Sequence, residues 1–462
     1  MRDFVILHVN GEPVRVAGDG IFESLSRFLR VRRGAAGTKV VCEEGDCGAC
    51  TLLVGKRDGD RLRYRAVNSC IQFVFQLDLA HVVTVEGLGG GEELTPVQEA
   101  MVRCHGAQCG YCTPGFVMAI AGMCEEGELD PARGITGNLC RCTGYEPIVK
   151  AANESTAAQK RMDEVYPSAP ILARIAEHER EPVRIANFFK PTTLADAIAF
   201  KSEQPQCVIV QGGTDFGVWC NKRNFVPPAV LSLDAVEGLG EIGVDGRELV
   251  VGARVPLAEF ERAVRELVPE LREIMDRFGS PQIKNAGTLA GNIANASPIA
   301  DTLPFLYVTG ATLELTGLAG VRRVAVADFY KGYKTLDLRA DEIITRIRIP
   351  LPADGDTLRL YKVSKRSHLD ISSFTAAMLM RRTDGRIDSM RVAYGGVGPV
   401  VLRLGKTEEF LKGKAISAET FAEAGEIARG EIAPISDVRG AREFRLQLAE
   451  NALCRFYYDA CT

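Results

Sequence analysis

The sequence has little excess charge, few histidines and no long apolar run, and these shortages exclude several classes of function. Net charge is −4 over 462 residues, so nothing favours nucleic acid or an anionic membrane surface as a partner. No apolar run reaches the length of about 18 residues that a membrane-spanning helix needs. The N-terminal stretch lacks the uninterrupted apolar region and the cleavage site of a signal peptide. We therefore expect a cytoplasmic protein that binds neither nucleic acid nor membranes.

Chain length and local patterns predict a multidomain protein of α+β class. At 462 residues, the expectation is roughly three domains of about 150 residues each. Short alternating strands come first, then a region with helical patterns only, and then strands and helices in alternation. The predicted parts are a strand-rich domain at 1–86, a helical domain at 92–163, a linker at 164–182, an α/β or α+β domain at 183–350 and an α+β subdomain at 351–462.

The cysteines are unevenly distributed along the chain. Of the 14 cysteines, ten lie between Cys42 and Cys142. In a reducing compartment this number is not expected to form a disulfide framework, so metal binding becomes the leading interpretation for the segment. The others are expected to be buried apolar residues or idle thiols. They are Cys207, Cys220, Cys454 and Cys461.

The first of two cysteine sets predicts an iron–sulfur cluster. It comprises Cys42, Cys47, Cys50 and Cys70. The spacing C-x4-C-x2-C with a distant fourth cysteine is the ligand order of plant-type [2Fe–2S] clusters. Gly45 and Gly48 allow the tight loop and the positive φ angles that such a wrap requires. Zinc sites favour two separated pairs of cysteines, so zinc and unligated thiols remain alternatives that fit the spacing less well.

The second set predicts another cluster but leaves zinc open. It comprises Cys109, Cys112, Cys140 and Cys142. A C-x2-C pair followed by C-x-C is unusual for a zinc ribbon, and a neighbouring first cluster would complete an electron path. Cys104 and Cys124 fall outside both sets, and we interpret Cys104 as a helix-face residue. His105 is expected to be a polar residue at a helix end.

Four stretches around these cysteines closely resemble the iron–sulfur part of the xanthine dehydrogenase (molybdenum hydroxylase) family. They read CEEGDCGACT, NSC, QCGYCTPGF and GNLCRCTGY. The resemblance implies that the first cluster sits in a ferredoxin-like β-grasp domain. It also implies that the second cluster sits in a four-helix domain and is held by the second cysteine set.

Two later segments suit a nucleotide cofactor. In Val208–Gly217 a buried strand runs into Gly212 and Gly213, where backbone N–H groups can approach phosphate oxygens. Many βα turns contain two glycines, so this signal alone is weak. Asn285–Asp301 carries no charge before its final residue and is rich in small and neutral polar residues. Such a segment suits a bound anion, although a buried Gly/Ala-rich turn is the alternative.

The same family resemblance extends over these segments and implies an FAD domain of the vanillyl-alcohol-oxidase type, followed by the family's C-terminal flavoprotein subdomain. The flavin contacts that it implies are Ile209, Val210, Gln211, Gly212, Gly213, Thr214, Asp215, Phe216, Phe278, Thr288, Leu289, Ala290, Gly291, Asn292, Asp301, Ile344 and Lys362. Leu369 stands where many members carry an acidic or amide residue, so the acceptor stays open between NAD and another molecule. His368 beside it is either a proton donor or a solvated loop residue.

The resemblance covers nearly the whole chain but does not include the family's molybdenum–pterin region. It implies an oxidoreductase subunit that passes electrons from a molybdopterin-binding large subunit through two [2Fe–2S] clusters to FAD and on to NAD. A dimer of heterodimers is the implied assembly. No catalytic side-chain constellation is expected, because the cofactors carry the chemistry.

Other functions stay open at this stage. The chain could be a stand-alone iron–sulfur flavin reductase or diaphorase, or part of a split hydroxylase for another N-heterocycle or an aldehyde. A zinc-bound assembly protein without enzymatic activity is the third alternative. Xanthine or hypoxanthine is the first expectation for the substrate, which the chain itself does not specify.

Overall fold

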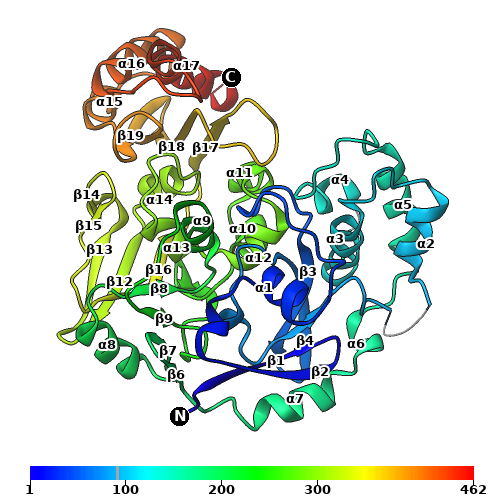
Figure 1. The fold of residues 1–462 in the computed structure, drawn as a ribbon. Coiled ribbons are helices and arrows are strands. Elements are labelled where there is room, and N and C mark those ends of the chain that lie inside the picture. Colours follow the sequence, from blue (N-terminus) through cyan, green and yellow to red (C-terminus); the bar gives the residue numbers. More distant parts are fainter. Residues whose placement is uncertain (90–92, 129, 462) are drawn as a thin grey trace. The chain divides into compact units, whose positions relative to one another are not determined.

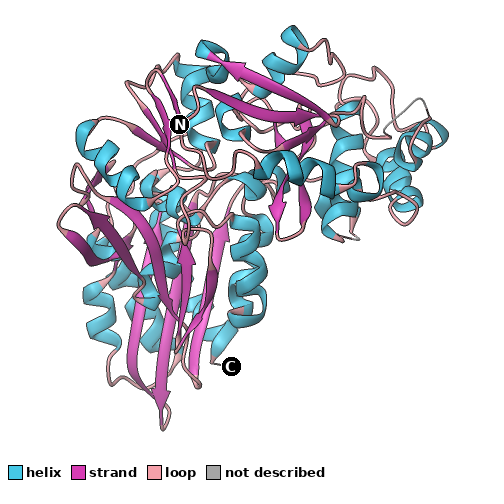
Figure 2. Ribbon diagram, turned by 90° about the horizontal axis from the view of Figure 1, so that it is seen from below, coloured by secondary structure: helices cyan, strands magenta, loops and turns pink. Residues whose placement is uncertain are grey.

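The computed structural model describes residues 1–89, 93–128 and 130–461. Residues 90–92, at the predicted boundary between the first two domains, lie outside the described residues. The chain forms two compact units: unit 1 contains Met1–Glu237 and Ser280–Gly287, and unit 2 contains Gly238–Gly279 and Thr288–Thr462. The predicted domain at 183–350 therefore contributes to both units. Both units combine helices with strands, so the protein is a multidomain α+β molecule (Figure 2).

Unit 1 begins with a mixed five-stranded sheet in the order β2-β1-β5-β3-β4 (Figure 1). Its strands are β1 (Phe4–Val9), β2 (Glu12–Ala17), β3 (Thr51–Asp58), β4 (Arg61–Asn68) and β5 (His81–Val83). Only β1 and β5 run parallel. The Asn10-Gly11 turn between β1 and β2 has positive φ at both residues, which is the hairpin geometry that this dipeptide favours. The short helical turns between the strands are η1 (Gly18–Phe22), α1 (Leu25–Arg27), η2 (Phe28–Arg32) and η3 (Val74–Leu77).

A helical region follows, as the local patterns predict. Its helices are α2 (Pro96–Arg103), α3 (Thr113–Glu126), α4 (Pro131–Gly134), α5 (Glu146–Ser155), α6 (Met162–Val165) and α7 (Ser168–Ala176). A capping box starts α2, since Thr95 and Gln98 each accept from the other's backbone N–H. Helix α5 ends at Ser155. The predicted linker contains α7, which buries Ile171, Leu172 and Ile175 at helical spacing.

The remainder of unit 1 is a four-stranded sheet in the order β6-β7-β9-β8. The strands are β6 (Val183–Ile185), β7 (Phe188–Lys190), β8 (Val208–Val210) and β9 (Val230–Ser232), and the helices are α8 (Leu194–Glu203), α9 (Thr214–Arg223) and α12 (Pro281–Ala286). Helix α12 comes from the second range of the unit and packs against β4.

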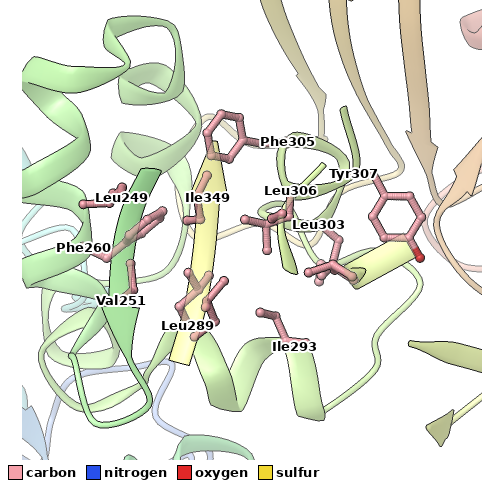
Figure 3. Packing of buried hydrophobic residues seen from close by; sticks show 14 of the residues in the cluster. Leu249, Val251, Phe260, Leu289, Ile293, Leu303, Phe305, Leu306, Tyr307 and Ile349 are labelled. Carbon is pink, nitrogen blue, oxygen red and sulfur yellow. The ribbon is translucent and has the colours of Figure 1, made fainter. Parts of the chain in front are cut away.

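Unit 2 contains a sheet in the order β10-β11-β16-β12-β13, covered by helices. The strands are β10 (Ile242–Asp245), β11 (Glu248–Gly252), β12 (Thr312–Gly317), β13 (Gly320–Ala325) and β16 (Ile343–Pro350), beside the short pair β14 (Tyr330–Gly332) and β15 (Thr335–Leu336). The helices are α10 (Leu257–Leu267), η4 (Pro269–Leu271), α11 (Arg272–Arg277), α13 (Leu289–Ala294), α14 (Leu303–Thr309) and η5 (Val326–Asp328). Side chains of β11 and β16, such as Val251 and Ile349, pack with Phe260 and Leu289 in one buried cluster (Figure 3).

The second sheet of unit 2 is antiparallel, in the order β17-β18-β19-β20. Its strands are β17 (Asp356–Val363), β18 (Phe374–Thr383), β19 (Arg386–Gly395) and β20 (Leu402–Arg403). The helices α15 (Gly405–Leu411), α16 (Ala418–Glu431) and α17 (Arg442–Ala460) lie together beside it (Figure 1). In the described part of the chain, every helix is too short or too polar to cross a membrane.

Candidate functional sites

The first cysteine set gathers at one end of the β3–β4 hairpin. Cys50 directly precedes β3 and Cys70 follows β4, so the antiparallel register of the two strands brings these residues together. The backbone N–H of Cys47 donates to Cys42 Sγ at 3.4 Å. Thiol–thiol hydrogen bonds join Cys42 to Cys47 and to Cys70, and Cys50 to Cys70. The four predicted sulfurs therefore lie in one group.

The loop that carries three of these cysteines depends on unusual backbone conformations. Gly45 and Gly48 have φ angles of 78° and 69°, and Glu43 adopts 56°. The Asn68 amide donates to the Gly45 carbonyl at 2.6 Å and holds the turn closed. A Cβ at position 48 would lie 2.3 Å from the Gly137 carbonyl oxygen, so only glycine permits this close approach.

Hydrogen bonds among the thiols of the first set shift their pKa values in opposite directions. Hydrogen bonds from Cys47 and Cys70 lower the pKa of Cys42, and the same bonds raise the pKa of the two donors. The Cys70 thiol also lowers the pKa of Cys50, against the effect of its burial. Metal ligation needs deprotonated thiols, so loading this set with iron would release the protons that these bonds hold.

The second cysteine set forms two pairs from different segments. The Cys142 thiol donates to Cys109 Sγ at 3.7 Å. Burial, followed by the hydrogen bond to Cys140, raises the pKa of Cys112 to about 12. The Thr143 hydroxyl donates to Cys140 Sγ at 3.2 Å. Two pairs of sulfurs match the needs of a two-iron cluster, in which each iron takes two protein thiolates.

The two sets differ in their exposure to solvent. Cys50 and Cys70 are each 2% exposed, whereas Cys109 and Cys142 are exposed. Near the second set in sequence, Tyr111, Leu139 and Tyr145 are also exposed, at 47%, 42% and 36%. Part of the second set therefore lies at the surface of unit 1.

A direct backbone contact connects the two sets. The N–H of Leu139, the residue before Cys140, donates to the Cys47 carbonyl at 3.0 Å. Beside it, the Asn138 amide donates to the Gly48 carbonyl at 2.9 Å, and the Gln282 amide donates to Asn138 Oδ1 at 2.8 Å. Both amide side chains are buried. Sequence reasoning missed these residues, and nothing local marks Gln282, which comes from α12.

The other cysteines of the helical region lie at ordinary structural positions. Cys104 ends α2 and donates to Glu154 Oε2 at 3.3 Å, and Cys124 on α3 donates to the Ile120 carbonyl at 3.2 Å. His105 follows α2 with a φ angle of 57°, at the predicted helix end.

Within the described residues, no group of three or more His, Cys, Asp or Glu side chains surrounds a single metal position.

The first predicted flavin loop is a strand–turn–helix in unit 1. Ile209 and Val210 belong to β8, and Thr214 to Phe216 form the first turn of α9. Gly213 is the N-cap of α9, with a φ angle of 72°. A Cβ on Gly212 would lie 2.2 Å from the Ala286 carbonyl oxygen. A glycine turn that leads into a helix N-terminus suits a phosphate group, because dipole and backbone N–H groups favour an anion there.

The other predicted flavin residues belong to unit 2. Leu289 to Asn292 lie on α13, and the N-cap Thr288 accepts from the Gly291 N–H at 3.0 Å. Asn292 Oδ1 accepts from the Thr302 hydroxyl at 2.6 Å. Phe278 follows α11 and Ile344 is buried in β16.

A buried ion pair joins two of these unit 2 residues. Lys362 Nζ lies 2.5 Å from Asp301 Oδ2, and their side chains are 2% and 6% exposed. The Ser372 hydroxyl donates to Asp301 Oδ1 at 2.5 Å, so both carboxylate oxygens are paired. A buried charge needs such partners. Sequence reasoning named Asp301 and Lys362 but missed Ser372.

The loop at 364–371 is held by its own hydrogen bonds. Asp370 Oδ2 accepts from the backbone N–H groups of Lys365 and Arg366. Leu369 adopts a φ angle of 56°. His368 Nδ1 lies 3.4 Å from the Asp276 carbonyl oxygen. Leu369 therefore occupies a left-handed position in a tight loop.

Two cysteine groups and a glycine turn at a helix N-terminus fit an iron–sulfur flavoprotein, and the comparisons with known proteins show that class. The chain matches the [2Fe-2S] binding domain at 84–153, the FAD binding domain in molybdopterin dehydrogenase at 183–352 and the CO dehydrogenase flavoprotein C-terminal domain at 359–460. The chain belongs to the molybdenum hydroxylase family of oxidoreductases and carries its [2Fe–2S] and FAD portion.

Individual relatives extend the match over nearly the whole chain. Xanthine dehydrogenase from Blastobotrys adeninivorans is 29% identical over 97% of this chain and 40% of its own length. Xanthine dehydrogenase/oxidase from Gallus gallus is 27% identical over 98% of this chain and also 40% of its own length. The structure of quinoline 2-oxidoreductase from Pseudomonas putida 86 matches with 30% identity and a TM-score of 0.55, over 59% of this chain and 95% of that chain. The chain thus spans about two-fifths of the length of these curated relatives.

Proposed function

We propose that this chain is the electron-transfer part of a molybdenum hydroxylase that resembles xanthine dehydrogenase. A molybdopterin-binding partner oxidises the substrate, and the electrons pass through this chain to FAD and then to NAD. When bound, the two clusters carry single electrons, and the flavin turns them into a two-electron transfer to the acceptor. The residues of this chain hold these groups, space them and exclude water from them.

The contact between the cysteine sets is the observation that carries the proposal. Cys109, Cys112, Cys140 and Cys142 would hold the cluster that receives electrons, because Cys109 and Cys142 are exposed where a partner can approach. Cys42, Cys47, Cys50 and Cys70 would hold the second relay. The hydrogen bond from Leu139 to Cys47 joins the two ligand segments directly. Burial of Cys50 and Cys70 keeps solvent away from the inner set.

The flavin assignment rests on the residues that the family resemblance implies, taken in each unit by itself. In unit 1, the turn at Ile209–Phe216 would hold a phosphate of FAD at the start of α9. In unit 2, Thr288–Asn292, Phe278, Asp301, Ile344 and Lys362 are the proposed contacts. The matched FAD binding domain at 183–352 includes every one of these positions except Lys362. Lys362 falls within the flavoprotein C-terminal match at 359–460.

The proposed domain types follow the same division. We assign a ferredoxin-like β-grasp domain to 1–86, a four-helix cluster domain to 92–163, and a linker to 164–182. A flavin domain of the vanillyl-alcohol-oxidase type at 183–350 and its C-terminal subdomain at 351–462 complete the chain. The mixed sheet with one parallel pair and the family matches at 84–153, 183–352 and 359–460 support this assignment.

A separate molybdopterin-binding subunit is the proposed partner, in a dimer of heterodimers. The curated relatives are more than twice the matched length, whereas the quinoline 2-oxidoreductase chain is covered to 95%. Segments similar to this chain thus occur as part of the long xanthine dehydrogenase chain and as most of the shorter quinoline 2-oxidoreductase chain. Xanthine dehydrogenases and an enzyme named for quinoline are both among the relatives. We therefore propose an N-heterocycle, with xanthine or hypoxanthine first, as the partner's substrate.

Cofactor analysis of the anaerobically purified chain tests the proposal. We expect about four irons and four acid-labile sulfides per chain, from two [2Fe–2S] clusters, and one FAD. The chain alone should transfer electrons from NADH to a dye but should not oxidise purines. Adding the molybdopterin-binding subunit should restore purine-dependent NAD reduction.

Three outcomes would contradict the proposal. A colourless protein with zinc and no labile sulfide would favour the assembly role. Full substrate turnover without any partner would show that no molybdopterin subunit is needed. A chain that contains both clusters and FAD and reduces dyes, but never accepts electrons from a partner, would favour a stand-alone reductase.

A further inference from the structure

Helix α9 lies along the segment that follows the fourth cysteine of the first set. At the start of the helix, the Gln76 amide donates to the carbonyls of Gln211 and Gly212 at 3.3 and 3.2 Å. The Gln72 amide donates to the Gly212 carbonyl at 3.3 Å. Two glutamines just after Cys70 therefore hold the turn from which α9 begins.

The middle of α9 approaches the same segment closely. A Cβ on Gly217 would lie 2.5 Å from the Ile71 carbonyl oxygen, so the helix and the segment are in backbone contact. Val218 packs against the buried group of Cys50, Cys70 and Ile71. The helix that leads away from the proposed flavin turn thus forms one wall of the first cysteine set.

Asn221, near the end of α9, contacts both parts of that set. Its amide nitrogen donates to the Cys70 carbonyl and to the Glu43 carbonyl, at 2.9 Å in each case. An asparagine amide has two N–H groups, so these two bonds use both of them. The Asn221 side chain thereby links Glu43, which follows Cys42, to Cys70.

The Glu43 end of this link needs support. Glu43 adopts a φ angle of 56°, a left-handed conformation that is unfavourable for residues other than glycine. Cys42 and Cys70 belong to different segments, and their sulfurs lie in hydrogen-bonding contact. The spacing between the two segments determines whether their thiolates can hold one cluster.

We propose that Asn221 is a positioning residue for the first [2Fe–2S] cluster. It holds the Cys42 side and the Cys70 side of the ligand set at a fixed spacing, from a helix that begins at the proposed flavin turn. This inference rests on the proposed function, because it requires a cluster at Cys42, Cys47, Cys50 and Cys70.

The test compares Asn221→Leu with a matched control, Asn187→Leu, in the full chain. Asn187 is also half-buried in unit 1, and its amide donates to the carbonyls of Pro227 and Pro228 at 3.2 Å each. Electron paramagnetic resonance of the reduced protein reports each cluster separately. A Cys142→Ser variant, which changes only the second set, assigns the two signals. Iron release to a chelator gives the stability of each cluster.

We expect Asn221→Leu to change the signal of the first cluster and to speed its iron release on the order of tenfold, as the loss of two hydrogen bonds implies. The second signal should keep its shape, and Asn187→Leu should leave both signals as in the wild type. A milder variant, Asn221→Ser, should show the same selectivity to a smaller degree if Asn221→Leu folds poorly.

Other outcomes overturn the inference. Unchanged signals and iron release in both Asn221 variants would show that the link does not position the ligands. An equal change in both signals would show a general loosening of unit 1. A wild-type chain without iron or labile sulfide would overturn the proposed function itself, which keeps the two failures distinct.

Discussion

At the scale of single residues, one buried carboxylate in unit 1 pairs with two buried cations. Asp78 pairs with Arg2 and Lys190 at 2.8 Å each, and all three side chains are at most 4% exposed. Burial acts to raise the pKa of Asp78, but Lys190 and Arg2 outweigh it and hold that pKa below its usual value. The stability from this triad is therefore present at neutral pH and is lost as acid protonates the carboxylate.

Removing that carboxylate should be costly. We expect Asp78→Ala to lower the free energy of unfolding by about 3–5 kcal/mol, because it removes the carboxylate beside buried Lys190 and leaves buried Arg2 with only the partly exposed Glu181 at 3.3 Å. Urea denaturation at pH 7 measures the change. Asp3→Ala is the control, since Asp3 and Arg15 form an exposed pair, for which we expect at most about 1 kcal/mol. Equal effects in the two variants would contradict this account.

Glu125 has the opposite titration behaviour. Burial raises its pKa to about 7, against the hydrogen bond from the Met162 N–H. A raised folded-state pKa means that stability is full below the ordinary value near 4.5 and is lost as pH rises through about 7. Glutamine keeps the acceptor and does not titrate.

We therefore expect Glu125→Gln to match the wild type at pH 4 and to exceed it by about 1–2 kcal/mol at pH 8. Thermal unfolding at the two pH values measures this difference. Glu126→Gln, at the exposed neighbour, should show no such pH dependence. A gain from Glu125→Gln that is equal at both pH values would rule out titration as the cause.

At the scale of elements, the contact between α3 and the first cysteine loop leaves no room for a side chain. A Cβ on Gly115 would lie 2.3 Å from the Gly48 carbonyl oxygen. We expect Gly115→Ala to lower the free energy of unfolding by about 1–3 kcal/mol, because helix or loop must move. The signals of both clusters should change, since α3 follows Cys112 and Gly48 adjoins Cys47.

A glycine in another helix provides the control. Nothing lies within 4 Å of a Cβ on Gly430 of α16, so Gly430→Ala should be neutral or stabilise by up to about 1 kcal/mol. Thermal unfolding and electron paramagnetic resonance measure both variants. A stable Gly115→Ala with unchanged signals would show that the contact is looser than the structure indicates.

At the scale of the whole molecule, unit 1 is completed by Ser280–Gly287, which returns from beyond part of unit 2 in sequence. This segment supplies Gln282, which donates to Asn138 and Thr51, and Asn285, which donates to the Ala66 carbonyl. A chain that ends at Glu237 should therefore be less stable than one in which 280–287 is rejoined through a flexible linker. We expect a difference of about 3 kcal/mol, at roughly 1 kcal/mol for each hydrogen bond.

Urea denaturation of the two shortened chains measures this contribution. A rejoined chain with Gln282→Leu and Asn285→Leu should lose most of the gain. If the chain that ends at Glu237 is as stable as the rejoined one, the returning segment does not stabilise unit 1.

Local features were predictable because they depend on neighbouring residues. Gly45 and Gly48 of the first cysteine loop adopt the predicted positive φ angles. The family matches also confirm membership of the molybdenum hydroxylase family. Membership was predictable because the family's motifs are short and continuous in the sequence. Helix α7, within the predicted linker, was harder to predict. It buries three apolar residues, but its helical pattern is short and follows a proline.

The amino-acid sequence by itself determined the cysteine spacing, the glycine turn before α9 and the class of chemistry that these motifs serve. Only the tertiary structure decided that Leu139 meets Cys47, that Gln282 joins Asn138, and that Asn221 links Glu43 to Cys70. The physical reason is separation along the chain. Spacing and periodicity report contacts within a turn, hairpin or helix, whereas a hydrogen bond between distant segments leaves no local pattern and exists only once those segments have packed.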